Sequence, residues 1–371
     1  MLILSIETSC DDTGVALLDV GKGQIKILVN FVSSQIAIHA PFGGVVPNLA
    51  VRAHYKNLPI LLEKTLAKIN PKKVDLIAAT NGPGLEPCLW AGINMAKVLA
   101  KAMGKPIVGV NHLEGHIAAN WLEASLRNDQ LPITNDQTNF KHSKLKTQNL
   151  KLFPAICLIV SGGHTQLVLM KDIGEYKVIG QTRDDAAGEA FDKVAKLLNL
   201  GYPGGPKIAL LAKKGCSDAF ELPRPMIGVQ NYDFSFSGLK TAVLYLMEGM
   251  DSRFRGNDKK ESGNDKITND VCASFQQAAI DVLVAKTIKA AIEYKVKTIM
   301  LGGGVSANQE LRKQMQNAVK KNFPSASFHL LPVKYCADNA VMIGLAGYWK
   351  YMRQGKGDKI EKIIAEANLN F

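Results

Sequence analysis

The sequence has no pair of cysteines spaced as C-x-x-C, although it contains 6 cysteines among 371 residues. They stand far apart, at positions 10, 88, 157, 216, 272 and 336. A zinc site built from cysteines uses closely spaced pairs, and disulfide-rich chains are short and secreted. Scattered cysteines in a chain of this length therefore predict reduced thiols and a cytoplasmic protein.

Long apolar runs are also missing, since no stretch approaches 18 uninterrupted apolar residues. A membrane-spanning helix needs about 20 such residues, so the sequence predicts no contact with a membrane. The apolar start MLILSI is followed at once by Glu7 and Asp11, with no basic segment before it and no small-residue cleavage site. This pattern indicates a buried strand rather than a signal peptide.

Two common nucleotide-binding motifs are absent. The chain contains no G-x-x-x-x-G-K-[ST] and no G-x-G-x-x-G that opens a helix after a first strand. The first absence excludes a P-loop ATPase, and the second argues against a dinucleotide-binding fold.

What the chain does contain is a globular composition with a basic excess. Hydrophobic residues make up 47%, charged residues 21%, and the formal net charge is +12. A basic surface attracts polyanions, of which nucleic acid is the commonest, although the excess can also be a set of solvated lysines. Charge alone slightly favours a nucleic-acid partner.

Strands alternate with helices along the chain, and the pattern starts twice. Residues 1–6 and 14–20 predict a β-hairpin, and residues 155–161 and 165–170 predict a second one with glycines at its turn. The other expected elements are strands at 74–79, 107–110, 298–301 and 328–333, and helices at 55–69, 87–103, 189–199, 271–294, 339–353 and after residue 308. Two such halves indicate an α/β protein of two related lobes with a ligand in the cleft between them.

The predicted lobes are residues 1–111 plus 339–371 and residues 112–338. Two polar segments interrupt the pattern, at 124–150 and 250–267, and lack a sustained apolar period. Both are predicted to be surface insertions.

Four strands end in small or polar turns, at 5–14, 80–84, 160–166 and 301–308. Glycine turns after strands free backbone N–H groups to point at phosphate oxygens. Each turn alone is a weak signal, because glycine serves many turns that bind nothing. The two turns carried by hairpins, at 5–14 and 160–166, predict a pair of loops that bind the phosphates of a nucleotide.

His112 and His116 stand at i and i+4 in NHLEGH, so a helix there places both imidazoles on one face. A zinc peptidase of the H-E-x-x-H type needs glutamate directly after the first histidine, where this chain has Leu113. Two surface histidines on a helix are the alternative interpretation. A metal site needs a third ligand, and Asp338, in the polar break CADNA between a strand and a helix, is a reasonable candidate. Two histidines and one carboxylate leave coordination positions open, as catalytic metal sites do.

Two further segments allow more than one interpretation. Asp184 and Asp185 precede a helix and are expected to cap it. Asp192 lies among apolar neighbours inside that helix and predicts either a ligand contact or an ion pair with a lysine. The segment 232–241 (YDFSFSGLKT) fits a core strand and equally fits an anion-binding turn.

Eleven motifs occur in the order in which one enzyme family has them. They are IETSCDDTG, GGVVP, NGPGL, NHLEGH, VSGGHTQL, DDAAGEAFDK, YPGGP, PRPM, DFSFSGLKT, GGGVSAN and CADNAVMI. The resemblance that they carry runs from residue 1 to about residue 350, interrupted by the two insertions. With them the chain closely resembles the universal tRNA threonylcarbamoyltransferase family (bacterial TsaD, formerly labelled O-sialoglycoprotein endopeptidase).

The resemblance implies a two-lobed, actin-like ATPase fold of the ASKHA, ribonuclease H-like type. It implies transfer of threonylcarbamoyl from threonylcarbamoyl-AMP to the N6 amine of adenosine 37, in tRNAs that read codons beginning with A. ATP is a further nucleotide ligand to expect. The resemblance also implies three partners: tRNA, the related dimerising protein TsaB and the P-loop ATPase TsaE.

The resemblance assigns site residues as well. His112, His116 and Asp338 would bind one divalent metal, with Fe²⁺ foremost and Zn²⁺ or Mg²⁺ open. The adenylate would lie on eight residues: Ile159, Val160, Ser161, Gly162, Gly163, Asp192, Gly205 and Asn308.

Asp11 or Asp12 would orient or deprotonate the attacking amine. The family usually has glutamate at position 12, whereas this chain has Asp12, whose side chain is one methylene shorter. A kinase or a non-catalytic scaffold of the same fold remains the alternative, but neither needs the histidine pair.

Overall fold

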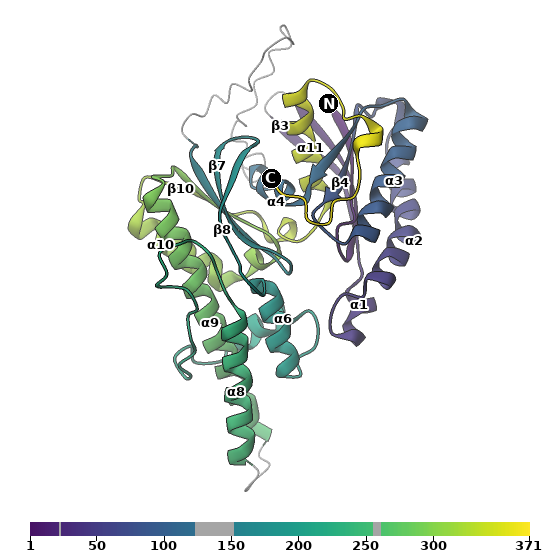
Figure 1. Cartoon of the computed structure of the whole chain (residues 1–371). Helices are drawn as coiled ribbons and strands as arrows, with labels where there is room; N and C mark the ends of the chain where they lie inside the picture. Colours follow the sequence, from purple (N-terminus) through teal and green to yellow (C-terminus); the bar gives the residue numbers. More distant parts are fainter. Residues whose placement is uncertain (22–23, 123–151, 255–260) are drawn as a thin grey trace. The chain divides into compact units, whose positions relative to one another are not determined.

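The computed structural model describes residues 1–21, 24–122, 152–254 and 261–371 (Figure 1). Residue contacts divide the chain into two compact units. Unit 1 comprises Met1–Phe153, Met170–Tyr176 and His329–Phe371, and unit 2 comprises Pro154–Leu169 and Lys177–Phe328.

Unit 1 is built on a five-stranded mixed sheet in the order β3-β2-β1-β4-β5. Its strands are β1 (Leu2–Glu7), β2 (Asp12–Gly21), β3 (Gln24–Ser34), β4 (Leu76–Gly82) and β5 (Ile107–Asn111). The first three form an antiparallel meander, and β4 and β5 run parallel to β1. The predicted hairpin is confirmed, whereas the edge strand β3 was missed because its exposed residues interrupt the apolar pattern.

Both faces of this sheet are covered by helices. The helices of unit 1 are α1 (Ile36–His39), α2 (Pro47–Leu66), α3 (Glu86–Met103), α4 (His112–Ala118) and α11 (Ala340–Gln354). Leu4 and Ile6 of β1 join the core beneath α2 and α3. The alternate residue Ser5 donates from its Oγ to the Ala340 carbonyl of α11, so α11 covers the opposite face (Figure 1).

Unit 2 repeats the strand order of unit 1. Its sheet is ordered β10-β9-β6-β7-β8. The strands are β6 (Ala155–Val160), β7 (Thr165–Asp172), β8 (Glu175–Gln181), β9 (Thr298–Gly302) and β10 (Ser327–His329). In each sheet three consecutive strands lie side by side, and the first of them pairs in parallel with the fourth. This internal repeat is the one that the sequence predicted.

The helices of unit 2 are α6 (Ala187–Leu197), α7 (Gly204–Ala212), α8 (Ser237–Phe254), α9 (Glu261–Glu293) and α10 (Gln309–Asn322). Phe191 of α6 meets Phe275 of α9 edge to face with ring centroids 4.9 Å apart. One window of α9 reaches a mean hydropathy of 1.2, but 78% of that window is buried inside the protein. Its apolar side chains are therefore covered by protein, as in the core helix of a globular domain.

Two predicted boundaries differ from the structure. The contact-defined unit 1 includes α4 and extends to Phe153, whereas the sequence placed the start of the second lobe at residue 112. The predicted insertion at 250–267 is helical at both ends, because α8 continues to Phe254 and α9 begins at Glu261. A helix that has already nucleated extends through polar residues at a cost of less than about 1 kcal/mol each. The other insertion, at 124–150, lies outside the described residues.

Candidate functional site

The NHLEGH segment forms a helix start directly after a buried strand. β5 ends at Asn111, whose Oδ1 accepts hydrogen bonds from the backbone N–H groups of Leu113 at 2.8 Å and Glu114 at 3.3 Å. An asparagine in this position fixes the first turn of the helix. His112 and His116 consequently lie one turn apart on α4, as their spacing predicted.

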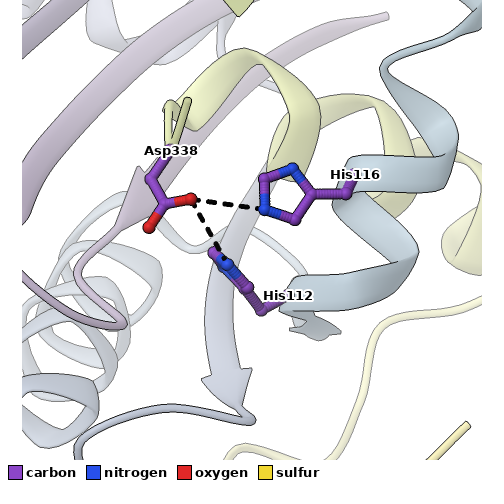
Figure 2. A group of neighbouring side chains, drawn as sticks. All are labelled: His112, His116 and Asp338. Carbon is purple, nitrogen blue, oxygen red and sulfur yellow. Dashed lines mark ion pairs between the residues drawn. The ribbon is translucent and has the colours of Figure 1, made fainter. Parts of the chain in front are cut away.

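Asp338 reaches the same place from the start of α11. The next residue, Asn339, caps α11 by accepting from the Met342 N–H at 3.2 Å. Asp338 Oδ1 lies 3.4 Å from His112 Nε2 and 3.3 Å from His116 Nε2 (Figure 2). One ligand atom from each residue lies within 4.8 Å of the other two. The structure thus brings Asp338 to the two histidines, from which it is more than 200 positions away in the sequence.

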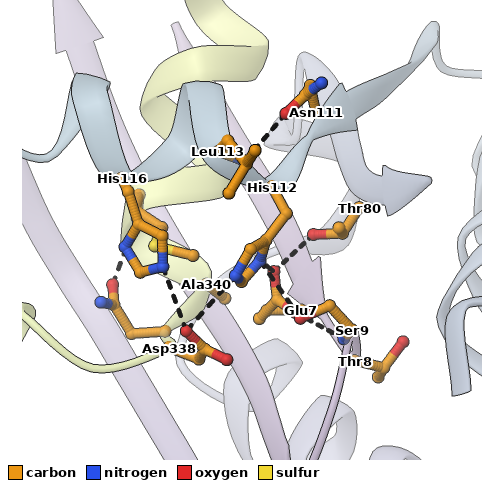
Figure 3. A network of polar contacts seen from close by, with 12 residues as sticks. Glu7, Thr8, Ser9, Thr80, Asn111, His112, Leu113, His116, Asp338 and Ala340 are labelled. Atoms are coloured by element: carbon orange, nitrogen blue, oxygen red, sulfur yellow. Dashed lines mark hydrogen bonds and ion pairs between the residues drawn. The ribbon is translucent and has the colours of Figure 1, made fainter. Parts of the chain in front are cut away.

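A second layer of polar groups holds His112. The Glu7 carboxylate is buried and accepts from the Ser9 N–H and the Thr80 hydroxyl, each at 2.5 Å (Figure 3). Its Oε2 lies 3.2 Å from His112 Nδ1. A proton on Nδ1 that is donated to Glu7 leaves the Nε2 lone pair facing Asp338. This carboxylate–histidine pair is the usual support of a metal-ligating imidazole.

The two histidines differ in their protonation. Burial would lower the pKa of His112, but the carboxylates of Asp338 and Glu7 outweigh it and raise the pKa well above 6.5. Burial lowers the pKa of His116 below 6.5. Burial opposes the charge on Asp338 as well, and the neighbouring His112 nevertheless lowers the pKa of this carboxyl group. Without a cation, the proton therefore resides on His112.

These residues fit a metal ion. His116 is fully buried, yet neither of its ring nitrogens has hydrogen-bond geometry with any group in the described part of the chain. His116 Nε2 faces the Asp338 carboxylate at 3.3 Å without hydrogen-bond geometry; an unsatisfied buried polar atom is costly, and a metal ion bound at Nε2 would remove that cost. Two imidazoles and one carboxylate leave coordination positions open for substrate. The Asp338 side chain is 22% exposed, so the site is reachable from solvent.

Glu114 lies on the same helix but points elsewhere. Its Oε1 accepts from the Tyr176 hydroxyl at 3.1 Å and from Arg353 Nη2 at 3.3 Å. A peptidase glutamate must activate water on the metal, and Glu114 is engaged in a buried ion pair instead. This contact agrees with the exclusion of a zinc peptidase from the sequence.

Asp11 and Asp12 follow β1, which also carries Glu7 at its end. Asp12 is the first residue of β2, opposite Ser34 of β3, and its Oδ1 is buried without a hydrogen-bond partner among the described residues. Burial, with smaller contributions from the negative charges of Asp338 and Asp11, raises the pKa of Asp12 from 3.8 to about 7. A carboxyl group with this pKa can accept a proton near neutral pH.

The glycine turn of unit 2 leaves its backbone accessible. Ser161 donates its N–H to the His164 carbonyl at 2.8 Å, which closes the turn around Gly162 and Gly163. Both glycines are exposed, and a Cβ added to either would meet no atom within 4 Å. Gly188 approaches this turn so closely that a Cβ would lie 2.6 Å from the Ser161 carbonyl oxygen. Ile159 and Val160, by contrast, are fully buried in β6 and can contribute only backbone groups.

Of the other residues expected at the adenylate, Asp192 and Asn308 have structural contacts. Asp192 Oδ1 accepts from the Gly204 N–H at 2.7 Å, which holds the start of α7. Gly205 has open space around it. Asn308 caps α10 by accepting from the N–H groups of Glu310 and Leu311, and its Nδ2 donates to Gln276 at 2.7 Å. Their binding role stays a prediction.

The expected cap on α6 is wrong. Asp184 accepts from the N–H groups of Phe236 and Ser237 and so supports the start of α8, a helix far along the chain. Asp185 pairs with Lys193 at 2.7 Å and Lys240 at 3.2 Å. The aromatic segment forms only an isolated β-bridge, between Phe234 and Thr182, before α8 begins at Ser237, and Phe234 and Phe236 are fully buried. These contacts join segments that are far apart in the sequence, so the local residue pattern could not predict them.

Sequence reasoning missed Glu7 and Thr80 as support for His112. A glutamate that ends the apolar strand MLILSIE is a usable signal, because a buried carboxylate needs partners. It also missed a buried cluster around His54, which gives no such signal.

Comparison with known proteins agrees with this architecture. The profile of the family described as tRNA N6-adenosine threonylcarbamoyltransferase (TsaD) matches residues 26–135 and 131–345. The protein of that name from Thermosipho africanus is 46% identical over 371 residues, covering 100% of both chains. The one from Clostridioides difficile is 41% identical and covers 100% of this chain and 99% of its own.

A solved structure, HypF of T. kodakarensis, shares the fold at a TM-score of 0.51 and 15% identity. It covers 98% of this chain, which spans about half (49%) of that HypF chain. The predicted two-lobed, actin-like α/β fold is confirmed by the family match and by the repeated sheet order. The chain belongs to the tRNA N6-adenosine threonylcarbamoyltransferase (TsaD) family.

Proposed function

We propose that this chain transfers a threonylcarbamoyl group from threonylcarbamoyl-AMP to the N6 amine of adenosine 37 in tRNAs that read codons beginning with A. In this reaction the amine nitrogen bonds to the carbamoyl carbon, the bond from that carbon to the phosphate oxygen breaks, and AMP leaves. The nitrogen also loses one proton. The His112–His116–Asp338 group is the observation that carries the proposal, because a kinase or scaffold of the same fold has no use for it.

The donor atoms favour a particular class of metal. Imidazole nitrogens suit Fe²⁺ or Zn²⁺, whereas Mg²⁺ prefers an all-oxygen shell. We assign Fe²⁺ first and Zn²⁺ second to His112, His116 and Asp338. When bound, such an ion supplies positive charge that polarises a carbonyl and stabilises developing negative charge. Glu7 keeps the His112 ring oriented for that ion.

The remaining roles fall to carboxylates and backbone groups. Asp12, or Asp11 beside it, takes or orients the proton of the attacking amine, and the raised pKa of Asp12 supports this assignment. Gly162 and Gly163 are exposed residues whose backbone N–H groups are suited to the adenylate phosphate, and the open space at Gly205 suits the nucleoside. Asp192 and Asn308, with Ile159, Val160 and Ser161, complete the proposed adenylate site; Asp192 also holds the start of α7, and Asn308 holds the start of α10. ATP would occupy the same residues.

The proposed setting follows from the substrate. The acceptor is tRNA, which agrees with the net charge of +12. We further assign TsaB and TsaE as protein partners, a cytoplasmic location and no membrane contact. All six cysteines are free, as a reducing compartment requires.

The test is transfer of labelled threonine to unmodified tRNA, with threonylcarbamoyl-AMP and the partner proteins supplied. His112→Ala should remove the bound metal and the product together. Glu114→Gln is the matched control, because Glu114 sits on the same helix but contacts Arg353 and Tyr176. It should keep metal and activity.

A wild-type protein that binds ATP but yields no labelled adenosine would contradict the proposal. Rapid phosphoryl transfer would then favour a kinase, and nucleotide binding without turnover would favour a scaffold.

A further inference from the structure

A cluster of buried, uncharged polar side chains lies beside the Asp11–Asp12 segment. Its members are Thr13, Gln35, His39 and His54, and each side chain is completely buried. Thr13 lies on β2, Gln35 directly before α1, His39 at the end of α1, and His54 on α2. Polar groups in a core destabilise the fold unless they are hydrogen-bonded, so the direction of their bonds shows what the cluster does.

The bonds of His54 define one tautomer. Its Nε2 lies 2.9 Å from the Cys10 carbonyl oxygen, which can only accept, so Nε2 carries the proton and donates it. Its Nδ1 lies 2.8 Å from Thr13 Oγ1 and must therefore accept from that hydroxyl. The ring is neutral with the proton on Nε2, and burial, which lowers the pKa of His54, agrees with this state.

Gln35 and His39 support the same ring. The Val46 N–H donates to His39 Nδ1 at 3.3 Å, so His39 Nε2 carries the proton and donates to Gln35 Oε1 at 3.1 Å. This fixes the Gln35 amide with its nitrogen toward His54, at 3.4 Å from Nδ1. The backbone N–H of Gln35 also donates to the Asp11 carbonyl at 3.1 Å.

The cluster thus holds the segment on both sides of its carboxylates. His54 fixes Cys10 and Thr13, and Gln35 fixes the backbone of Asp11 between them. We propose that His54 is a positioning residue for the transfer reaction, which keeps Asp11 and Asp12 in place through its hydrogen bonds to Cys10 and Thr13. This inference rests on the proposed function of the two aspartates.

The test compares three variants in the transfer assay. His54→Phe keeps a ring in the core but leaves the Cys10 carbonyl and the Thr13 hydroxyl without partners. Because small displacements of a reacting group cost about 100-fold in rate, we expect kcat to fall about 10- to 100-fold, with KM for tRNA changed less than about threefold. Thr65→Val is the matched control, since Thr65 is also fully buried on α2 and its hydroxyl donates, among the described residues, to the Leu61 carbonyl of that helix. It should leave kcat unchanged.

A double mutant separates positioning from a general loss of structure. If His54 acts through Asp12, the pair His54→Phe/Asp12→Asn should be no slower than Asp12→Asn alone. If the double mutant is slower than Asp12→Asn by the same factor by which His54→Phe slows the wild type, the inference is overturned. A His54→Phe enzyme with wild-type kcat would also overturn it. If Asp12→Asn is itself fully active, the proposed role of Asp12 has failed, which is a separate result from wild-type kcat in His54→Phe.

If the His54→Phe variant does not fold, two other measurements still test the proposal. His54→Gln keeps a donor for the Cys10 carbonyl and should stay within about fivefold of the wild-type kcat; a loss as large as 100-fold in a folded protein would contradict the inference. In the wild-type protein, ¹⁵N NMR of the imidazoles should show His54 neutral with its proton on Nε2 between pH 6 and 8. A proton on Nδ1, or a cationic ring, would overturn the proposal whatever the variants do.

Discussion

Replacing Asp12 with asparagine should stabilise the metal-free protein at pH 8 and abolish a pH dependence that the wild type shows. The folded state raises the pKa of Asp12 from 3.8 to about 7. Between these two values the folded protein keeps a proton that the unfolded chain has already lost. Stability therefore falls as the pH rises from about 4 to about 7, and the full cost persists above pH 7.

The magnitude follows from the size of the shift. A difference of one in pKa corresponds to about 1.4 kcal/mol, so the difference between 3.8 and about 7 gives an upper limit of about 4 kcal/mol. Asp12 is only partly buried, and water screens its charge, which reduces the expected gain to about 1–3 kcal/mol. Asparagine has nearly the same shape and carries no charge, so at pH 8 it should raise the free energy of unfolding by this amount.

The assay is unfolding followed across pH 4.5–8.5 in the presence of a chelator. Asp19→Asn is the control, because Asp19 lies on the same strand with its side chain 52% exposed. The reasoning is refuted if Asp12→Asn and the wild type give parallel stability curves. The same variant should lose transfer activity while it gains stability, since a neutral amide cannot accept the proton of the amine.

Three further outcomes test the metal site and the loops. Binding of a divalent metal must displace the Nε2 proton of His112, so the affinity for the metal should rise about tenfold per pH unit between pH 6 and 7. Calorimetry in two buffers should show the release of one proton. A metal affinity that is independent of pH would contradict the proton assignment. Glu7→Gln should weaken metal binding about 10- to 100-fold in a chelator competition, and an unchanged affinity would show that Glu7 does not support the ligand. Asn308→Ala removes the cap of α10 and should destabilise unit 2 by about 1 kcal/mol in thermal unfolding, whereas a stability equal to the wild type would show that the cap contributes little.

The fold was predictable where local periodicity is strong. α3 and β5 combine sustained apolar spacing with clear ends, and their observed bounds lie within one residue of the predicted ones. β8 was missed because alternate residues are exposed and the strand carries few apolar side chains. The start of α8 was missed because its N-terminal support, Asp184, lies about fifty residues earlier in the chain.

The candidate site was likewise predictable only where local sequence spacing determines the geometry. The spacing of His112 and His116 predicts a shared helical face, because that relation depends only on the geometry of one turn. Asp338 could be suggested as a third ligand but not placed by spacing, and the contacts of Glu7, Thr80 and His54 depend entirely on how the sheet of unit 1 is assembled. Contacts between segments that are distant in the sequence depend on how the whole unit packs, and no short stretch of sequence determines that packing.

One glycine shows how packing and site are connected. Gly115 stands between the two histidines of NHLEGH, where a side chain would be expected to stabilise the helix. A Cβ at this position would lie 2.9 Å from Ile343 Cδ1 and 3.2 Å from Met342 Cγ, both on α11. The missing side chain lets α4 and α11 approach each other, and Asp338 stands directly before α11. The approach that brings this carboxylate to 3.3 Å from His116 therefore depends on a glycine whose cost to the helix, about 1 kcal/mol, is otherwise unexplained.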